Sequence, residues 1–270
     1  MPKAPKLPAP PVPRSLREPP PRPGDANGRK TPLQGAGEAG ITVVDWVDER
    51  TSLSGATRWL LFRKVPKGTN WFYTLGSATL FAFLSQAVTG VFLAMYYRPD
   101  AAGGAYESIR YVTNDVFLGQ FVRGMHKWGS SVMVILVFVH MGRTFFFGAY
   151  KYPRELNWVI GVVLLILTLV MSFTGYLLPF DQRAYWATIV GVNINGTGPL
   201  IGPYLSDFLR GGSEFGATTL SRFYAIHMLL VPGAIVALIG AHLYLVTKLG
   251  TTAPPWQKAE SAEELREAEV

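Results

Sequence analysis

The chain has 270 residues, of which 49% are hydrophobic and only 16% are charged, and its mean hydropathy is +0.21. This composition is too apolar for an ordinary soluble domain and favours a membrane protein. The chain contains no cysteine, which excludes disulfides, iron–sulfur ligation and thiolate ligation of a metal within it. Histidine and methionine remain as the soft metal ligands.

The net charge of +7 is concentrated at the start of the chain. Residues 1–32 hold seven Lys and Arg against Glu18 and Asp25, and 11 of the 20 prolines, with almost no large apolar side chain. We expect residues 1–42 to form a basic, Pro-rich, disordered arm beside anionic lipid headgroups. The arm lacks the apolar core of a signal peptide, so we expect a cytoplasmic N-terminus. The rest of the chain is nearly neutral, and nucleic-acid binding has no support.

Residues 43–64 alternate irregularly between apolar and charged side chains. Trp46 and Trp59 are among the apolar ones, and Arg50 and Arg58 are among the charged ones. The segment carries too many charges to cross a bilayer. It predicts an amphipathic helix that lies in the membrane interface before the first span.

Residues 65–250 contain four apolar windows of transmembrane length, followed by a polar C-terminal tail at 251–270. The expected spans are about 71–97, 124–150, 157–180 and 223–247. The loop at 150–155 is short and net positive, as are both chain ends next to the membrane. Positively charged loops stay in the cytoplasm, so this loop and both termini are expected there.

All four histidines lie in the second and fourth expected spans. His140 follows His126 after fourteen positions, and His242 follows His227 after fifteen. At about 100° and 1.5 Å per residue, each pair shares one side of its helix and is separated by roughly 21–22 Å along the axis. The second and fourth spans run parallel, so the histidines are expected to meet as His126 with His227 and His140 with His242.

Two such bis-imidazole sites, one near each membrane face, suit haem held for electron transfer, because both axial positions of the iron are filled. A single membrane histidine is more often a helix–helix hydrogen-bonding residue or a proton relay. Four histidines in matched pairs, with no others in the chain, favour two haems. No residue of the chain is identified as catalytic.

The glycines repeat the shorter of these intervals. Gly76 and Gly90 in the first span, and Gly161 and Gly175 in the third, are each separated by fourteen positions. Two flat macrocycles stacked along a bundle require the helices without ligands to lack side chains where the rings pass. Packing of small residues between membrane helices is the alternative for each glycine taken alone.

Two arginines lie close to the histidines in sequence. Arg123 precedes His126 by three residues and Arg143 follows His140 by three, each toward the nearer membrane face. We expect them to pair with the anionic haem propionates. Snorkelling of a long side chain to the interface is the alternative, and both roles are compatible.

Several runs between about residues 44 and 250 resemble the cytochrome b family, and cytochrome b6 most closely. They are Asp45-Trp46 with Glu49-Arg50, Tyr96-Tyr97-Arg98-Pro99, Lys151-Tyr152-Pro153-Arg154-Glu155-Leu156, Thr174-Gly175-Tyr176-Leu177-Leu178-Pro179-Phe180-Asp181-Gln182, and Arg222-Phe223-Tyr224 before His227. The longer histidine interval in the fourth span is also similar to the b6 type.

The resemblance implies an all-α membrane protein, a four-transmembrane-helix bundle that binds two non-covalent b haems. Such a chain is the dihaem subunit of a quinol:cytochrome c oxidoreductase of the bc or b6f type, and is incomplete as an enzyme by itself. His126 and His227 would hold the outer haem, and His140 and His242 the inner one. Electrons would pass from quinol at the outer face to a Rieske protein and, through both haems, to quinone at the inner face, with proton translocation.

The resemblance also implies an outer quinol pocket. The positions that match its walls are Phe173, Tyr176, Arg183, Ala187 and Val190. The acidic Pro-Glu-Trp-Tyr motif of the family does not occur in this chain. A separate C-terminal cytochrome b half, resembling subunit IV, is therefore expected as a partner, with a Rieske iron–sulfur protein, a cytochrome c-type acceptor and a second copy of the complex. The expected location is an energy-transducing membrane, the cytoplasmic membrane of a bacterium.

At two positions the sequence differs from the pattern of the family. Thr74 stands where b6-type chains have the cysteine of a further covalent haem, so we expect no such haem; Thr247, with Lys248 beside it, replaces an inner-site arginine. Two other functions remain open at this point: the dihaem membrane anchor of another quinone-linked dehydrogenase, and a non-redox transporter with histidine proton relays. The first would not need the outer-pocket run, and the second would show no b-type absorption.

Overall fold

The computed structural model describes residue 43 and residues 45–51, 69–252 and 254–255. These residues form helices and loops, with no β-strand among them. Val43 and residues 45–51 are helical, within the range expected for the amphipathic helix. The Pro-rich arm, most of that helix and nearly all of the C-terminal tail lie outside the described residues, so those expectations stay predictions.

Four helical segments are long and apolar enough to cross a membrane, as expected from the sequence. They are η2 (Trp71–Thr74) continued by α3 (Leu75–Ala94), α5 (Gly119–Phe146), α6 (Glu155–Leu177), and the continuous run of α9 (Ala217–Ala225), η3 (Ile226–Leu230) and α10 (Val231–Leu249). Each overlaps one of the expected spans. The helical, four-span fold is therefore confirmed.

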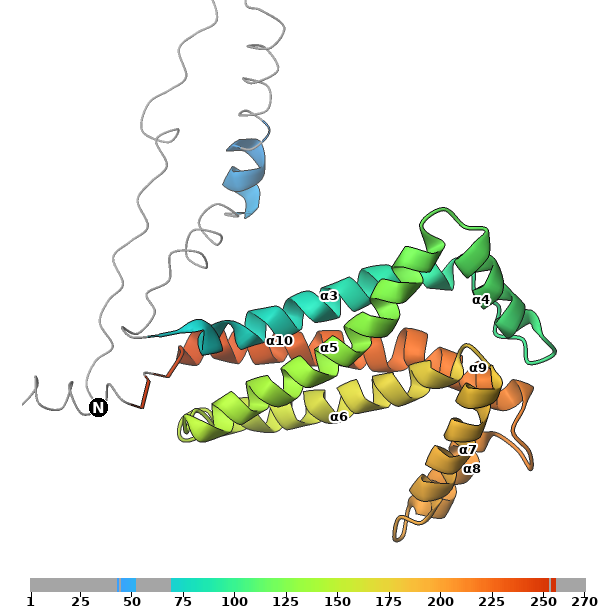
Figure 1. Cartoon of the computed structure of the whole chain (residues 1–270). Helices are drawn as coiled ribbons and strands as arrows, with labels where there is room; N and C mark the ends of the chain where they lie inside the picture. The colour runs from blue at the N-terminus through green and yellow to red at the C-terminus, as the bar shows by residue number, and fades with distance from the viewer. Residues whose placement is uncertain (1–42, 44, 52–68, 253, 256–270) are drawn as a thin grey trace, which may run out of the picture. The chain divides into compact units, whose positions relative to one another are not determined.

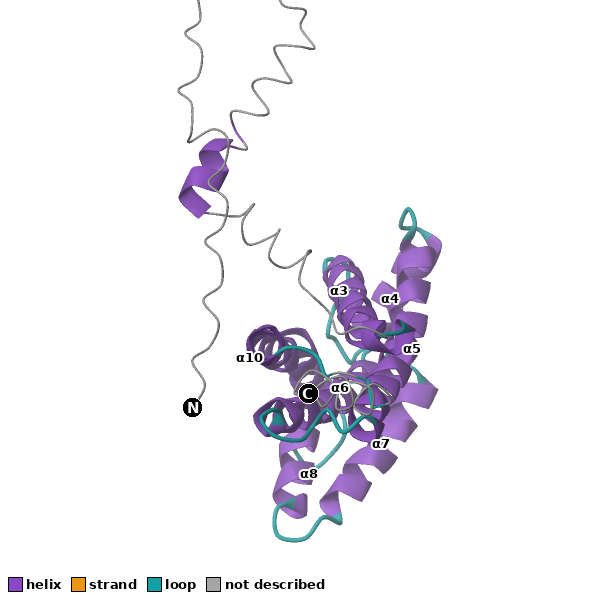
Figure 2. Cartoon of the chain, turned by 90° about the vertical axis from the view of Figure 1, so that its left-hand side faces the viewer, coloured by secondary structure: helices purple, strands orange, loops and turns teal. Residues whose placement is uncertain are grey.

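The four long helical segments pack as two pairs. Helix α3 lies against α5, and α6 lies against α10, while α5 and α6 join the pairs (Figures 1 and 2). Among the described residues, the backbones of α5 and α10 hardly approach each other, although these segments carry the histidines. The space between the two pairs is therefore left to side chains.

Three shorter helices gather at one end of the bundle, called the helical end here: α4 (Gly104–Asn114), α7 (Gln182–Gly196) and α8 (Gly202–Arg210) (Figure 1). The Asp181 side chain accepts a hydrogen bond from the backbone N–H three residues on, at 2.8 Å, and so begins α7. Gly211, with φ of +80°, ends α8. The opposite end, called the loop end, carries the α5–α6 loop, the start of α3 and the end of α10.

A π-helical turn interrupts the fourth segment at η3. The backbone N–H of Val231 bonds to the carbonyl of Ile226, five residues back. Pro232 follows and has no N–H to donate to the carbonyl four residues back, which favours a wider turn. The turn takes up one extra residue, so the longer interval from His227 to His242 returns to the same helix face as the shorter interval does on α5.

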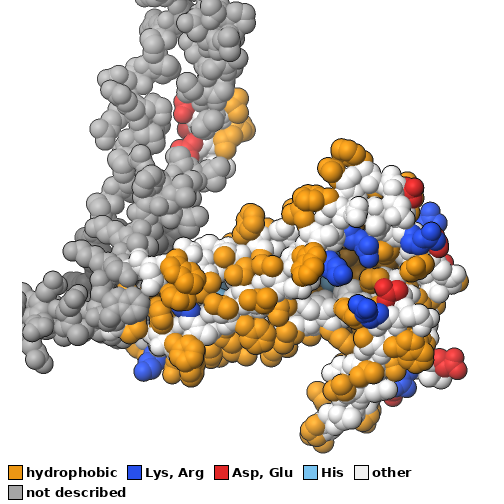
Figure 3. Space-filling view, in the orientation of Figure 1, with side chains coloured by type: hydrophobic (Ala, Val, Ile, Leu, Met, Phe, Trp, Pro, Cys, Tyr) orange, Lys and Arg blue, Asp and Glu red, His pale blue; other side chains and the backbone are white. Residues whose placement is uncertain are grey.

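Most of the apolar surface of the spans faces outward. Only 6% to 22% of the residues in each span's most apolar window are buried within the chain. Figure 3 shows apolar side chains along the length of the bundle, with acidic and basic side chains clustered at the helical end. Lipid, cofactors or other chains must cover the remaining apolar surface.

Arg154 joins the α5–α6 loop to the end of α10. Its Nε donates to the carbonyl of Gly250 and its Nη2 to that of Leu249, both at 3.2 Å. The last carbonyls of a helix have no partner within the helix, so a guanidinium at this position caps α10 from a neighbouring segment. This contact fixes the loop end of the α6–α10 pair.

We expect Arg154→Ala to lower the free energy of unfolding by about 2 kcal/mol, because two charge-assisted hydrogen bonds are lost. Thermal unfolding of the detergent-solubilised protein, followed by circular dichroism, measures the change. Lys151→Ala is the matched control, since Lys151 lies exposed in the same loop. Equal unfolding temperatures for the two variants would contradict the capping role.

Candidate functional site

Two histidines face each other near the helical end of the bundle. His126 comes from α5 and His227 from the π turn η3, with ring centroids 6.4 Å apart and ring planes at 78°. Two imidazoles that bind one metal ion from opposite sides lie roughly 6 Å apart, because each bond is about 2 Å long and each ring centre about 1 Å further. The pair is therefore spaced to hold one metal ion between the rings.

A cavity lies beside this pair, between the α3–α5 and α6–α10 helix pairs. Its walls are mainly apolar and include Phe83, Met133, Met171 and Ile235 as well as both histidines. No group of three or more His, Cys, Asp or Glu side chains gathers within the described part of the chain. A metal here would thus have two protein ligands and need its others from a bound cofactor, which fits haem.

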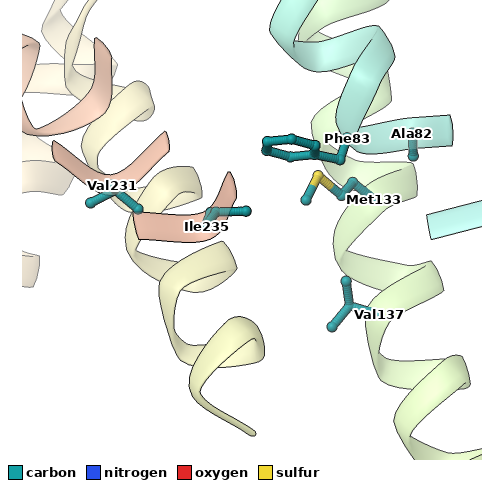
Figure 4. Close-up of a cluster of buried hydrophobic side chains, with 6 residues drawn as sticks. All are labelled: Ala82, Phe83, Met133, Val137, Val231 and Ile235. Atoms are coloured by element: carbon teal, nitrogen blue, oxygen red, sulfur yellow. The ribbon is translucent and has the colours of Figure 1, made fainter. Parts of the chain in front are cut away.

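The other two histidines lie toward the loop end, His140 on α5 and His242 on α10, near enough to interact electrostatically. A layer of buried side chains lies halfway between the two pairs. It consists of Phe83, Met133, Thr168 and Ile235, each seven or eight residues from the histidine or glycine on either side along its own helix. Figure 4 shows Phe83 and Met133 pointing from α3 and α5 toward Ile235 on α10. The layer separates the two histidine pairs.

Each of the four glycines faces one histidine. A Cβ atom added to Gly76 would lie 3.2 Å from Cε1 of His140, and one added to Gly90 would lie 3.2 Å from Cε1 of His126. The two glycines of α6 likewise face the histidines of α10 and η3. There the distances are 3.7 Å from Gly161 to Cε1 of His242 and 2.5 Å from Gly175 to Cε1 of His227.

The glycines therefore make room for the imidazole rings themselves. Their expected place along the path of the macrocycles stays a prediction, and the structure adds that each faces a histidine ring. Each histidine ring rests against the bare backbone of the neighbouring helix, and a methyl group at the closest of these contacts would displace it.

The Nδ1 atoms of the helical-end pair have partners that sequence reasoning missed. Nδ1 of His126 lies 2.9 Å from Oγ1 of Thr89, while Nδ1 of His227 lies 3.1 Å from the Met171 carbonyl and 3.3 Å from Oγ1 of Thr174. Both threonines directly precede one of the four glycines. The repeated Thr-Gly pair was the available signal in the sequence.

The loop-end pair is different. Nδ1 of His140 is buried with no hydrogen-bond partner among the described residues. Nδ1 of His242 is also buried without a hydrogen bond of ordinary geometry, although the Asn157 backbone carbonyl lies nearby. The two histidine pairs are thus alike in spacing and unlike in their polar surroundings.

The two arginines near the histidines, Arg123 and Arg143, also differ in whether their donors have hydrogen-bond partners. Arg143 lies over the ring of Tyr73 at 3.9 Å from its centroid, and its Nε and Nη2, with the Tyr73 hydroxyl, are buried and have no hydrogen-bond partner in the described structure. These donors near His140 fit an anionic group such as a haem propionate. Arg123 instead donates to Oγ1 of Thr113 on α4, at 3.0 Å.

The residues expected around the quinol pocket are exposed, with one exception. Arg183, Ala187 and Val190 are exposed on one face of α7, four and three residues apart, and Tyr176 is also exposed. Phe173 turns inward and packs on Phe223, with ring centroids 5.5 Å apart. The exposed four are therefore open to the surroundings of this chain.

Paired histidines from two membrane helices, each backed by a glycine and one pair beside an apolar cavity, are the arrangement of a b-type cytochrome. Residues 60–250 match the family model described as Cytochrome b/b6/petB. The chain belongs to the cytochrome b/b6 family. The family identified from the sequence is therefore confirmed.

Relatives of this family cover most of the chain. It is 43% identical to the menaquinol:cytochrome c reductase cytochrome b subunit of Geobacillus thermodenitrificans, over 78% of this chain and 97% of that protein. It is 41% identical to cytochrome b6 of Heliobacterium modesticaldum, over 78% of this chain and 100% of the relative. Among solved structures, a chain of a hyperthermophilic respiratory Complex III matches with a TM-score of 0.72 and 32% identity. The match covers 78% of this chain but spans only 56% of the Complex III chain.

The four glycines differ in how closely they hold the histidines, and this makes a graded prediction. We expect Gly175→Ala to lose one haem, because its Cβ would lie 2.5 Å from the His227 ring, while Gly161→Ala keeps both, because 3.7 Å is ordinary contact. Haem per chain, measured by pyridine haemochrome absorbance, tests this.

Gly233→Ala is the control. Gly233 lies in the same helical segment as His227, and nothing lies within 4 Å of a Cβ atom added to it. It should bind as much haem as the unmodified protein. Equal haem loss for Gly161→Ala and Gly175→Ala would show that the glycines do not act through the histidine rings.

Proposed function

We propose that this chain is the dihaem cytochrome b subunit of a quinol:cytochrome c oxidoreductase of the bc or b6f type. The observation that carries the proposal is the opposed pair His126 and His227, 6.4 Å apart beside an apolar cavity. The names of the relatives agree with it, because they are cytochrome b subunits of menaquinol:cytochrome c reductases and cytochromes b6.

Two sites follow from the arrangement of the histidines. His126 and His227 ligate the haem nearer the helical end, and His140 and His242 ligate the haem nearer the loop end. Gly90 and Gly175 back the first site, as Gly76 and Gly161 back the second. The Arg143 donors that have no partner among the described residues favour it as the propionate partner of the second haem, whereas Arg123 has one of its donors engaged by Thr113.

Haem bound at these sites would supply one-electron transfer, with the two histidines of each pair as its protein ligands. The protein holds and orients the four imidazoles and excludes water from the cavity with apolar walls. The buried layer of Phe83, Met133, Thr168 and Ile235 keeps the two sites apart within the low-dielectric interior. The chain thus provides two separate one-electron sites in series along the bundle.

The sites have a direction across the membrane. The loop end carries the net positive α5–α6 loop, so we place it, with both termini, at the cytoplasmic face of a bacterial membrane. The helical end is then the outer face. Quinol oxidation at the helical end and quinone reduction at the loop end would release protons outside and take them up inside.

A second polypeptide completes the outer quinol site. Tyr176, Arg183, Ala187 and Val190 present an open surface, which fits one wall of a pocket between two chains. The relatives that match almost end to end are cytochrome b subunits of similar extent, whereas the Complex III chain is much longer. We therefore propose a separate C-terminal cytochrome b half, a Rieske protein, a cytochrome c-type acceptor and a dimeric complex as partners.

A reduced-minus-oxidised spectrum of the purified complex tests the proposal, and b-type absorption from two haems is expected. Single substitutions then assign the sites. His126→Ala and His227→Ala should each remove one and the same haem, and His140→Ala and His242→Ala should each remove the other, because each haem would need both histidines of its pair.

The bands that remain in each variant identify the haem that was lost. Tyr244→Phe, an exposed position on α10, is the control and should keep both haems. Absence of b-type absorption from the unmodified complex would reject the proposed function. Removal of the same haem by His126→Ala and His242→Ala would reject the pairing.

A further inference from the structure

The two histidine pairs receive different hydrogen bonds at Nδ1. In the pair at the helical end, each Nδ1 lies within hydrogen-bond distance of a threonine hydroxyl, Thr89 for His126 and Thr174 for His227. Both threonines are buried, at 6% and 1% exposure. Within the described part of the chain, no hydroxyl bonds to Nδ1 of either histidine at the loop end.

The threonine hydroxyls donate their protons to backbone carbonyls, and this sets the direction of their hydrogen bonds with the histidines. Oγ1 of Thr89 donates to the Ser85 carbonyl at 2.7 Å, and Oγ1 of Thr174 donates to the Val170 carbonyl at 2.8 Å. Each hydroxyl has only one proton, so toward the imidazole its oxygen accepts, as does the Met171 carbonyl that lies 3.1 Å from Nδ1 of His227. The proton between threonine and histidine therefore belongs to Nδ1.

This assignment has a consequence for the metal-facing side of each ring. A neutral imidazole that carries its proton on Nδ1 has a free lone pair on Nε2, which is the atom available to an iron ion. The hydroxyl acceptor also increases the electron density of the ring and makes it a stronger ligand. Thr89 and Thr174 thus act on a metal through the histidines.

The same positions are apolar in the other site. Thr89 directly precedes Gly90, and Thr174 directly precedes Gly175, whereas Leu75 precedes Gly76 and Ile160 precedes Gly161. At all four places the glycine faces the ring of one histidine. The sequence therefore repeats the glycine at all four places and changes the residue before it between the two sites.

We propose that Thr89 and Thr174 are positioning residues that lower the reduction potential of the haem held by His126 and His227 relative to that of the other haem. A more electron-rich axial ligand stabilises ferric over ferrous iron, so hydrogen bonding at Nδ1 lowers the potential. The difference directs electrons from the outer site to the inner one. This inference rests on the proposed function, because it requires a haem at each site.

A purely structural role for these threonines makes a different prediction. Threonine hydroxyls in helices often bond back to the carbonyl four residues earlier, as Thr79 does to Leu75 on α3. Such a bond stabilises or bends a helix without touching a histidine. Substitution would then change stability and leave the haem potentials where they are.

Potentiometry of the two b bands in the purified complex distinguishes these roles. We expect Thr89→Val to raise the potential of the outer haem and reduce the equilibrium constant for outer-to-inner electron transfer by about three- to tenfold, where tenfold is about 59 mV for one electron. Thr89→Ser keeps the hydroxyl and should restore a potential close to that of the unmodified complex. Thr79→Val is the control, because it removes only a back-bond, and it should change neither potential.

A substitution that adds a hydroxyl at the other site tests the same role without removing a native hydrogen bond. Leu75→Thr places a hydroxyl directly before Gly76, the position that corresponds to Thr89, beside His140, whose Nδ1 is buried and has no hydrogen-bond partner among the described residues. It should lower the potential of the inner haem and leave the outer one unchanged. If Thr89→Val fails to bind haem, this variant still decides the question.

The outcomes separate this inference from the proposed function. No b-type bands in the unmodified complex would reject the function itself. Two haems whose potentials are unchanged in Thr89→Val and in Leu75→Thr would reject only the role of the threonines. Equal shifts in Thr89→Val and Thr89→Ser would also reject it, because the hydroxyl would then not be the cause.

Discussion

The contact between an imidazole ring and the bare backbone at a glycine is the constraint on which the bundle depends. It occurs four times, twice between α3 and α5 and twice between α6 and the segment of η3 and α10. Each contact holds a histidine at a fixed depth while its helix lies close to the neighbour. The helices therefore pair as α3 with α5 and α6 with α10, and the histidines face the space between the pairs.

That space is divided by chemistry as well as by packing. The layer that contains Met133 and Ile235 separates the histidine pair at the helical end, which has hydroxyl partners, from the pair at the loop end, which lacks them in the described structure. The loop-end pair instead has nearby the donors of Arg143 and Tyr73, which have no hydrogen-bond partner among the residues that the structure describes. A bundle with nearly symmetric spacing can in this way provide two unequal sites, and inequality is what gives electron transfer a direction.

Much of this could be predicted from periodicity alone. Apolar windows of transmembrane length specify four spans, because a bilayer requires every backbone group to be bonded within its own helix. The repeated intervals between histidines and between glycines specify which side chains share a helix face, because the helix has a constant turn. The sequence by itself therefore determined the four spans, the two histidine pairs and the presence of glycines that match them.

Tertiary structure alone decided what those residues touch. The glycines face the histidine rings themselves, the π turn before Pro232 absorbs the extra residue of the fourth segment, and Arg123 bonds to Thr113 on a different helix. Periodicity fixes the direction of a side chain from its own axis, but not the rotation and depth of the helix opposite. The threonine contacts with the histidines depend on that second helix, so they emerge only when α3 lies against α5 and α6 against α10.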